Sequence, residues 1–228
     1  MSSRQRILLL GGTREAAELA RTLVAEGHDV TTSLAGRTKE PRPVAGSVRM
    51  GGFGGTEGLA DWLRAHRIER LIDATHPFAE TISRNAVLAG AMAGVPVERI
   101  ERPPWDRCPG DDWREAPHIA AAVDLLPAGA TVLLALGSQH IAPFARRDDV
   151  TFVVRMVDRP AQPLPLRRHR LVLARPSPDP NEEADLLRRE AIGWIVCRNS
   201  GGPGAYAKIE AARRLGLPVV MIARPAAR

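Results

Sequence analysis

Short apolar runs alternate with longer amphipathic stretches along almost the whole chain of 228 residues, and this alternation restricts the fold more than any other feature. The runs are typical of buried strands, whereas the stretches between them repeat apolar residues at the spacing of one helix face. Strands are expected at residues 6–10, 29–33, 48–50, 69–73, 96–100, 131–136, 151–155, 171–174, 194–197 and 218–222. Helices are expected at residues 14–26, 57–66, 78–93, 117–126, 181–191 and 205–215, with a short one from 138. This order of elements predicts parallel sheets that helices cover on both faces.

The alternation is interrupted between residues 101 and 116, where prolines, aspartates and two tryptophans gather. We interpret this segment as a connector or a site-forming loop. The chain therefore divides into two halves, residues 1–103 and 104–228, although no close internal repeat relates them. The predicted fold class is α/β, with two Rossmann-like lobes that contain mainly parallel sheets.

The composition is that of a folded globular protein, with 44% apolar and 25% charged residues. No apolar run approaches the roughly 20 residues that span a bilayer, and Ile7–Leu10 is too short for the core of a signal peptide. Cys108 and Cys197 lack histidine neighbours at ligand spacing, so the sequence indicates neither a disulfide framework nor a metal site. We expect a cytoplasmic protein with no membrane partner and no bound metal.

The net charge of +6 favours anionic partners such as nucleic acid, acidic membranes, nucleotides or polycarboxylate metabolites. However, the arginines are scattered along the chain, and aromatic residues make up only 4% of it. The basic stripe interleaved with aromatics that marks nucleic-acid binding is therefore missing. We expect a small anionic molecule as the partner and no nucleic acid.

The first strand is followed by Gly11-Gly12-Thr13-Arg14-Glu15, which leads into the first helix. A helix N-terminus offers free N–H groups and the positive end of its dipole, which suit a pyrophosphate. The full dinucleotide fingerprint G-x-G-x-x-G is not present. A tight turn in which Thr13 is only the N-cap of the helix therefore remains an alternative.

The end of the second strand carries no acidic residue, whereas an NAD-dependent enzyme usually has Asp or Glu there to bind the ribose hydroxyls. The chain instead has Thr32-Ser33-Leu34-Ala35-Gly36-Arg37-Thr38-Lys39. Hydroxyl groups and a guanidinium suit a 2′-phosphate, because Arg pairs with phosphate oxygens through charge-assisted hydrogen bonds. This favours NADPH over NADH, and a solvated basic loop is the alternative.

Two further segments follow strands of the first half. Gly51-Gly52-Phe53-Gly54-Gly55 can be a flexible turn, or a loop in which Phe53 makes a stacking contact. Asp73-Ala74-Thr75-His76-Pro77-Phe78 lies at the carboxyl edge of the sheet, where ligands bind in open α/β folds. His76 is a possible proton donor, although a single histidine at a strand end is more often structural.

The second half has its own turns between strands and helices, Gly137-Ser138-Gln139 and Asn199-Ser200-Gly201-Gly202, and the second is followed by Tyr206 and Lys208. Two familiar motifs fail on spacing. A P-loop requires Gly-Lys-Ser/Thr in sequence, and Lys208 does not stand in that context. Tyr206 and Lys208 are two positions apart, whereas the Tyr-x-x-x-Lys pair of short-chain dehydrogenases needs one helical turn.

Together these motifs resemble the precorrin-6A reductase family of the corrin pathway, over nearly the whole chain. The matching strings are Ile-Leu-Leu-Leu-Gly-Gly-Thr-Arg-Glu-Ala from Ile7, Gly51–Gly55, Ile72–Ala79, Arg102–Trp105, Leu136–Gln139, Asn199–Gly202 and Ala207–Arg213. The string Asp-Ala-Thr-His-Pro-Phe-Ala is the most specific of them. Cys197-Arg198 departs from the Ser/Thr-Lys type of pair expected before Asn199.

The resemblance implies an NADPH-dependent reduction of one double bond of precorrin-6A to give precorrin-6B, without metal or flavin. It implies an N-terminal NADPH-binding lobe and a polycarboxylate tetrapyrrole bound between the lobes of a monomer or weak homo-oligomer. The expected cofactor contacts are Gly11, Gly12, Thr13, Arg14, Glu15, Ser33, Ala35, Gly36, Arg37, Thr38, Gly52, Phe53, Asp73, Ala74 and Thr75. The expected substrate contacts are His76, Pro77, Phe78, Arg102, Gly137, Ser138, Gln139, Asn199, Ser200, Gly201, Gly202, Tyr206 and Lys208.

The carboxylates of such a substrate suit the positive charge of the chain, and the candidate clamps are Arg14, Arg102, Arg155, Arg159 and Arg198. Two alternatives stay open at this stage. One is a different NADPH-dependent reductase or epimerase on the same fold. The other is a non-catalytic module that binds anions or nucleic acid.

Overall fold

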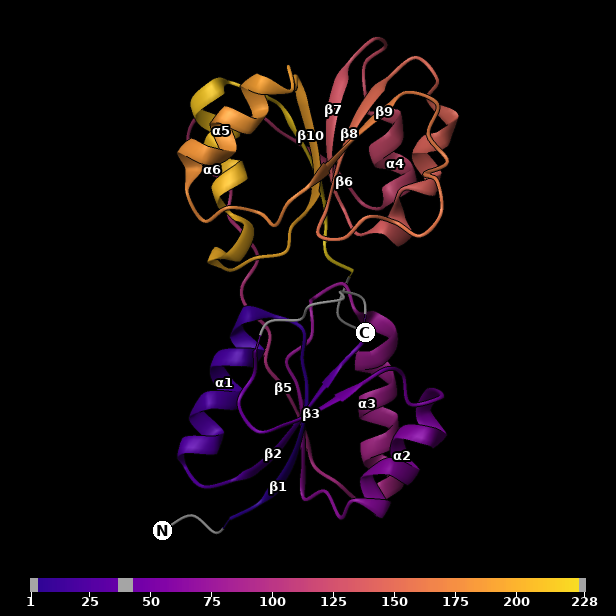
Figure 1. The fold of residues 1–228 in the computed structure, drawn as a ribbon, viewed down its shortest axis with the longest axis vertical. Coiled ribbons are helices and arrows are strands. Elements are labelled where there is room, and N and C mark those ends of the chain that lie inside the picture. The colour runs from indigo at the N-terminus through magenta and orange to yellow at the C-terminus, as the bar shows by residue number, and fades with distance from the viewer. Residues whose placement is uncertain (1–3, 37–42, 226–228) are drawn as a thin grey trace. The chain divides into compact units, whose positions relative to one another are not determined.

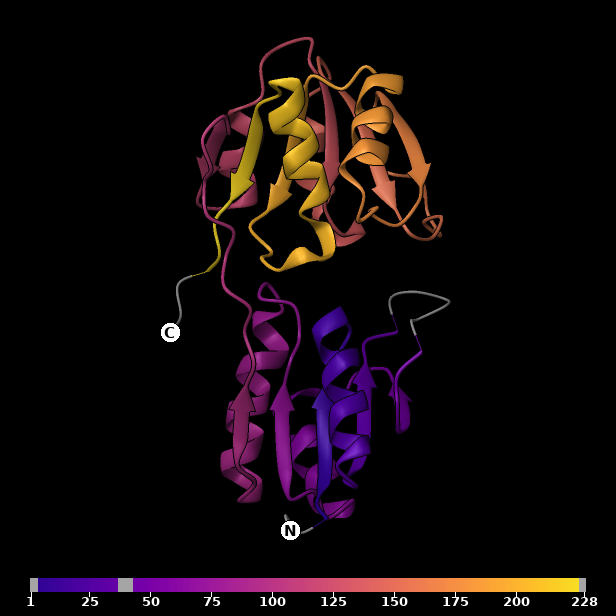
Figure 2. The same ribbon diagram turned by 90° about the vertical axis from the view of Figure 1, so that its left-hand side faces the viewer.

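The computed structural model describes residues 4–36 and 43–225, and Figures 1 and 2 show its ribbon from two sides. The chain folds into two compact units, Met1–Arg102 and Pro103–Arg228. Each unit is an α/β structure built on one parallel sheet.

The N-terminal unit has a five-stranded sheet in the order β3-β2-β1-β4-β5, and all its strands are parallel. The strands are β1 (Arg6–Leu10), β2 (Asp29–Leu34), β3 (Ser47–Met50), β4 (Arg70–Asp73) and β5 (Val97–Arg99). The helix α1 (Arg14–Ala25) covers one face of the sheet, and α2 (Gly55–Ala65) and α3 (Glu80–Ala93) cover the other (Figure 1).

Alternation along β1 explains how both faces are buried. Ile7 and Leu9 pack against apolar residues of α1, whereas Leu8 and Leu10 point to the opposite face and pack against α2 and α3. All four side chains are at most 1% exposed. An uninterrupted apolar run is therefore what a central parallel strand requires.

The C-terminal unit has a six-stranded parallel sheet in the order β6-β11-β10-β7-β8-β9. Its strands are β6 (Trp113–Ala116), β7 (Thr131–Ala135), β8 (Thr151–Met156), β9 (His169–Leu173), β10 (Trp194–Arg198) and β11 (Val219–Ile222). Helices α5 (Pro180–Arg189) and α6 (Ala207–Leu215) pack on one face. Helix α4 (Ile119–Asp124) lies on the other (Figure 1).

Each sheet has a point where the strand order reverses, and in open α/β sheets ligands bind outside the carboxyl ends of the strands at such a point. In the N-terminal unit, β1 lies between β2 and β4, so the chain runs outward to β3 and then returns to the far side of β1. In the C-terminal unit the reversal lies between β7 and β10. The turns after β1 and β4, and those after β7 and β10, are thus brought to the same sheet edges.

The predicted fold class is confirmed, and the strands and helices expected from the alternation are present within a few residues of their predicted ends. The prediction for residues 101–116 is wrong in its last part, because Trp113–Ala116 forms the edge strand β6. The prolines and aspartates of this segment favour a loop, and β6 lacks an apolar run because only Trp113 and Ala116 are buried while the two residues between them are charged. The short helix expected from residue 138 is a pair of 3₁₀ turns, Ser138–His140 and Ala142–Arg146.

None of the helices in the described ranges combines the length and the apolar character needed to cross a membrane.

Candidate functional site

The turn after β1 leaves its backbone open at the carboxyl edge of the sheet. Gly11 packs closely, since a Cβ atom there would lie 2.8 Å from Cγ2 of Thr32. Gly12 has a φ of +105° and no heavy atom within 4 Å of the position a Cβ would take. A glycine at this position therefore supplies both the backbone conformation and the space for a ligand to approach the chain.

Thr13 joins the turn after β1 to the turn after β4. Its Oγ1 accepts a hydrogen bond from the backbone N–H of Ala16 (3.1 Å), which caps α1, and donates one to the carbonyl oxygen of Ala74 (2.9 Å). The N–H of Ala74 donates to the carbonyl of Leu10 over 3.0 Å. The reading of Thr13 as the N-cap is confirmed, and the cap also fixes the spacing of the two turns at the switch point.

Asp73, at the end of β4, organises the turn that follows it. Its Oδ1 accepts hydrogen bonds from the N–H (3.1 Å) and the hydroxyl (2.6 Å) of Thr75. Oδ2 of Asp73 and Oγ1 of Thr32 are both buried, and in the described part of the chain neither has a hydrogen-bond partner. Because unpaired buried polar atoms cost free energy, this edge of the sheet can gain from a ligand with matching polar groups.

The segment after Thr75 is more compact than an exposed active-site loop. Nδ1 of His76 accepts a hydrogen bond from the N–H of Phe78 over 3.3 Å, and the two rings lie 5.7 Å apart. Pro77, between them, is buried. One ring nitrogen of His76 is thus engaged in shaping the start of α3.

Glu15 and Arg102 pair beside the same turn, with a distance of 2.7 Å between Oε2 and Nη1. Burial raises the pKa of Glu15, but hydrogen bonds from the Glu15 backbone N–H and from Arg102 outweigh burial, so that this pKa lies below its ordinary value. Arg14 instead forms an exposed pair with Glu18. Of the two candidate clamps in this unit, Arg102 is already neutralised and Arg14 is accessible.

Arg49, near the end of β3, is absent from the residues predicted from the sequence. Its guanidinium donates hydrogen bonds to Oγ of Ser33 and to the carbonyl oxygens of Gly51 and Gly52, each over 2.9 Å. Sequence pattern misses Arg49 because its place beside Ser33 depends on the register between β2 and β3. The predicted contacts Arg37 and Thr38, with Lys39, lie outside the described residues.

In the C-terminal unit, the turn after β10 forms hydrogen bonds with Trp105, near the first residue of the unit. The amide of Asn199 accepts a hydrogen bond from the N–H of Trp105 (2.7 Å) and donates one to its carbonyl (2.9 Å). Trp105 Nε1 donates to the carbonyl of Gly202 over 2.7 Å, and Arg224 donates to the carbonyls of Asn199 and Ser200. The turn after β7, Gly137-Ser138-Gln139, is exposed, and its main chain forms no hydrogen bond with Trp105.

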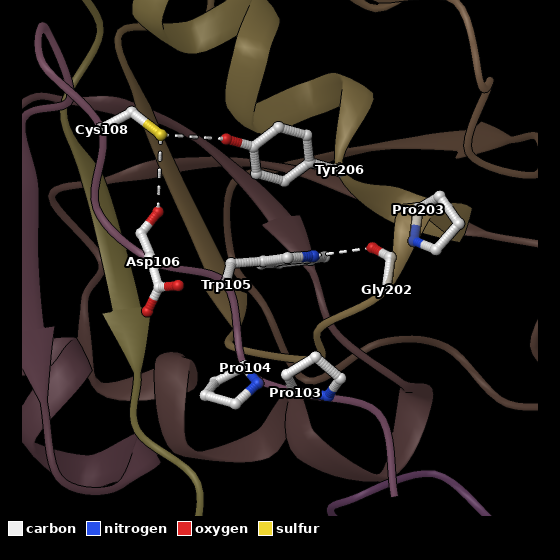
Figure 3. A pocket seen from close by; sticks show the side chains of 8 residues that line it. All are labelled: Pro103, Pro104, Trp105, Asp106, Cys108, Gly202, Pro203 and Tyr206. Carbon is white, nitrogen blue, oxygen red and sulfur yellow. Dashed lines mark hydrogen bonds between the residues drawn. The ribbon is translucent and has the colours of Figure 1, made fainter.

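A pocket of about 410 Å³ opens beside Trp105, and its lining residues are Pro103, Pro104, Trp105, Asp106, Cys108, Gly202, Pro203 and Tyr206 (Figure 3). The Trp105 and Tyr206 rings lie 5.7 Å apart. The hydroxyl of Tyr206 accepts a hydrogen bond from Arg213 (2.7 Å) and lies 3.7 Å from the sulfur of Cys108. Prolines and aromatic rings thus give this pocket a rigid, mainly apolar wall.

Two of the predicted cationic contacts are buried inside the C-terminal unit. Lys208 is 4% exposed; its ammonium donates to the carbonyl of Ala205 (2.6 Å) and lies 4.9 Å from the centre of the Trp105 ring. Burial lowers the pKa of Lys208. The expectation that Arg155 clamps substrate is wrong, because its guanidinium forms a buried ion pair with Glu183 in which both side chains are 3% exposed. By contrast, Arg159 is exposed and Arg198 is partly buried.

Among residues 4–36 and 43–225, no three histidine, cysteine, aspartate or glutamate side chains gather as a metal ion would require. Cys108 and Cys197 are free thiols.

Two doubly wound parallel sheets, each with glycine-containing turns at its switch point, define a Rossmann-type α/β protein. The family model for precorrin-6x reductase CbiJ/CobK matches residues 6–228. The chain belongs to this family, which confirms the resemblance drawn from its motifs. Because the family consists of reductases, the expectation of an oxidoreductase is also confirmed at that level.

The relatives support this assignment over almost the whole length. A precorrin-6A reductase of Rhodobacter capsulatus is 47% identical over 97% of this chain and 88% of its own, and one of Mycobacterium tuberculosis is 45% identical over 96% and 89%. A cobalt-precorrin-6A reductase of Priestia megaterium is 29% identical over 96% and 90%. The solved structure of a CobK precorrin-6A reductase superposes with a TM-score of 0.94 at 47% identity, over 98% of this chain and 90% of that one.

Proposed function

We propose that the protein reduces one double bond of precorrin-6A with NADPH, giving precorrin-6B. The main support for NADPH as the cofactor comes from the carboxyl edge of β1 and β2. There the open glycine turn after β1 lies beside the end of β2, which has no acidic residue. The substrate is inferred from two relatives named precorrin-6A reductase, which are 47% and 45% identical to this chain over almost its whole length. A reaction that consumes NADPH draws on the cytoplasmic pool, so we propose a cytoplasmic location as well.

The residues at this edge fit the groups of a dinucleotide. The open backbone at Gly12 and the first turn of α1 suit the pyrophosphate, because helix N-termini present N–H groups and a positive dipole. Ser33, Ala35 and Gly36 at the end of β2 suit the adenosine ribose. Oγ1 of Thr32 and Oδ2 of Asp73, which lack partners among the described residues, belong to the strands on either side of β1 and suit polar groups of a dinucleotide bound at this edge.

NADPH supplies the hydride for the reduction, and the protein has to bind and orient both reactants. Thr13 holds the two turns of the switch point at fixed spacing, and Asp73 holds the turn that leads to His76. Positioning of this kind can supply a large part of a rate enhancement. We propose Gly137, Ser138 and Gln139 as substrate contacts because this turn is exposed at the second switch point.

For the other predicted contacts of the C-terminal unit, we propose a supporting role. Asn199 and Gly202 hold Trp105 through hydrogen bonds, and the Lys208 ammonium lies 4.9 Å from the centre of its ring. Gly201 packs against Pro103, and the carbonyl of Ser200 accepts a hydrogen bond from Arg224. Tyr206 lines the pocket directly. These residues would therefore act on substrate through the shape of the wall around Trp105.

Thermal unfolding in the presence of NADPH or NADH tests the cofactor, since a ligand that binds the folded state raises its stability by mass action. We expect NADPH to raise the melting temperature at concentrations where NADH has little effect. Oxidation of NADPH, followed by its absorbance, should then require precorrin-6A supplied by the preceding enzymes of the pathway. A shift with NADPH but no oxidation with precorrin-6A would indicate another reductase, and no shift with either dinucleotide would refute the proposal.

A further inference from the structure

Arg49 is placed where the adenosine ribose of a dinucleotide lies in this fold. It is on β3, the edge strand, and pairs in register with Ser33, the second-last residue of β2. The end of the second strand of a Rossmann-type half carries the residue that distinguishes NAD from NADP, an acid for the free 2′-hydroxyl or an arginine for the 2′-phosphate. In this unit the neighbouring strand brings a guanidinium to that position.

The guanidinium of Arg49 is held firmly by neutral groups. Nη1 donates to Oγ of Ser33 and to the carbonyl of Gly51, and Nη2 donates to the carbonyl of Gly52. The ring of Phe53 lies under the guanidinium, 3.7 Å from its carbon to the ring centre. Hydrogen bonds on one edge and an aromatic ring on one face fix both the direction and the plane of the cation.

No carboxylate in the described ranges forms an ion pair with Arg49. Other arginines of the same unit do have acidic partners, as Arg64 has Asp61, Arg70 has Glu98 and Arg102 has Glu15. Burial lowers the pKa of Arg49, which means that it disfavours the charged form. No acidic side chain among the described residues pairs with Arg49 to offset this effect. A cation that is fixed in place, partly buried and without a counter-ion among the described side chains is suited to an anionic ligand.

We propose that Arg49 binds the 2′-phosphate of NADPH and sets the preference of this protein for NADPH over NADH. The inference rests on the proposed function and deepens it by naming a specificity residue. A guanidinium has five N–H donors, and three of those of Arg49 are engaged by Ser33, Gly51 and Gly52. The remaining donors, on Nε and Nη2, can reach phosphate oxygens in a charge-assisted pair.

Two variants and a control test the proposal. Arg49→Met keeps an unbranched side chain against Phe53 but removes the charge, and Arg49→Lys keeps a charge without the planar donors. Arg21→Met is the matched control, because Arg21 is an exposed residue of α1 and the substitution changes the net charge by the same amount. Circular dichroism and thermal unfolding establish that each variant is folded before its binding is measured.

The readout is binding of NADPH, NADH, 2′,5′-ADP and ADP, measured by calorimetric titration without any turnover. We expect Arg49→Met to weaken NADPH and 2′,5′-ADP about 10- to 100-fold, as the loss of a charge-assisted phosphate contact implies. NADH and ADP should change less than about 2-fold, because neither carries the 2′-phosphate that the charged pair would bind. Arg49→Lys should fall between the wild type and Arg49→Met, and Arg21→Met should match the wild type.

Equal losses for NADPH and NADH in a folded Arg49→Met variant would show that Arg49 only supports the Gly51–Gly52 turn, and would overturn the proposal. An unchanged preference for NADPH would overturn it too, while leaving the proposed function intact. If the wild type binds neither dinucleotide, the proposed function itself fails and this inference with it. Should Arg49→Met not fold, the ratio of NADPH to NADH affinity in Arg49→Lys decides, and an unaltered ratio refutes the role of Arg49.

Discussion

The guanidinium of Arg102 donates a hydrogen bond to the carboxylate of Glu15 over 2.7 Å, and so ties the last residue of the N-terminal unit to the first turn of α1. The two side chains are 16% and 30% exposed. Glu15 lies next to the turn proposed to bind a pyrophosphate, where an unpaired carboxylate would repel the ligand. The pair therefore neutralises Glu15 at the N-terminus of α1, which leaves this end of the helix suited to an anion. It also fixes the last residue of the N-terminal unit to α1.

This pair predicts that stability is lost in acid. The pKa of Glu15 lies below its ordinary value of 4.5, because its hydrogen bonds outweigh the opposing effect of burial. An acid whose pKa is lower in the folded state contributes stability above its unfolded pKa and loses it as the pH falls through its folded pKa. Below pH 4.5 we therefore expect Glu15 to stop contributing about 1 kcal/mol, a value reduced for its partial exposure.

Urea unfolding of the wild type and of Glu15→Gln measures this contribution. The variant should be less stable at pH 7, and its difference from the wild type should shrink as the pH falls below 4.5. Glu18→Gln is the matched control, since Glu18 pairs with Arg14 on the surface. This substitution should lower the free energy of unfolding by less than about 0.5 kcal/mol. A difference for Glu15→Gln that is the same at both ends of the pH range would rule out the ion pair as its cause.

Thr13 predicts a loss of both stability and cofactor binding when its hydroxyl is removed. Thr13→Ala loses the cap on Ala16 and the hydrogen bond to Ala74, so the free energy of unfolding should fall by about 1–2 kcal/mol. Thr13→Ser keeps a hydroxyl and should retain most of that stability. NADPH titration should show the same order, wild type and Thr13→Ser above Thr13→Ala. If Thr13→Ser is as damaged as Thr13→Ala, the methyl group and not the hydroxyl carries the effect.

Local sequence pattern predicts the elements of this fold well, because central strands such as β1, β7 and β11 are buried on both faces and form apolar runs. It fails for β6, an edge strand in which the charged Arg114 and Glu115 are exposed. It also fails to predict the role of Arg49, because the local sequence shows only a polar residue in a short strand before a glycine-rich loop. Its role depends on the register between β2 and β3 and on the turn at Gly51 and Gly52, and neither follows from the local sequence.

The buried cations of the C-terminal unit show the same limit. The sequence predicts Lys208 as a substrate contact and Arg155 as a candidate clamp for carboxylates, since charged side chains are mostly exposed. In the structure the Trp105 ring and the Ala205 carbonyl accommodate Lys208, and Glu183 accommodates Arg155. These partners lie outside the strand or helix that carries each cation, so only the tertiary structure reveals that both charges are buried beside them.

The ion pair between Arg155 and Glu183 predicts opposite results for single and double substitutions. Arg155→Met leaves Glu183 as a buried unpaired charge and should cost about 3–5 kcal/mol of unfolding free energy. Adding Glu183→Gln removes that charge and retains an acceptor for the N–H of Ser177, which donates to Glu183 over 2.8 Å. The double variant should recover most of the stability in urea unfolding. A double variant that is as unstable as Arg155→Met would rule out the unpaired charge of Glu183 as the cause of the loss.

Gly201 predicts that the wall around Trp105 does not tolerate even one added methyl group. Gly201 has a φ of +67°, and a Cβ there would lie 2.1 Å from the carbonyl oxygen of Pro103. Gly201→Ala should therefore lower the free energy of unfolding by about 2–4 kcal/mol, through backbone strain and the forced movement of Pro103.

Gly204→Ala is the control within the same loop, because no heavy atom lies within 4 Å of its Cβ position and its φ is not positive. This substitution should leave stability unchanged or raise it by up to about 1 kcal/mol, as fewer unfolded conformations compete. Urea unfolding reports stability, and because the chain has four tryptophans, the NMR signal of the Trp105 indole N–H reports the surroundings of this residue. Because Asn199 and Gly202, on either side of Gly201, form hydrogen bonds with Trp105, this indole signal should shift in Gly201→Ala alone. Equal behaviour of the two alanine variants would mean that the turn after β10 adapts freely and does not fix Trp105.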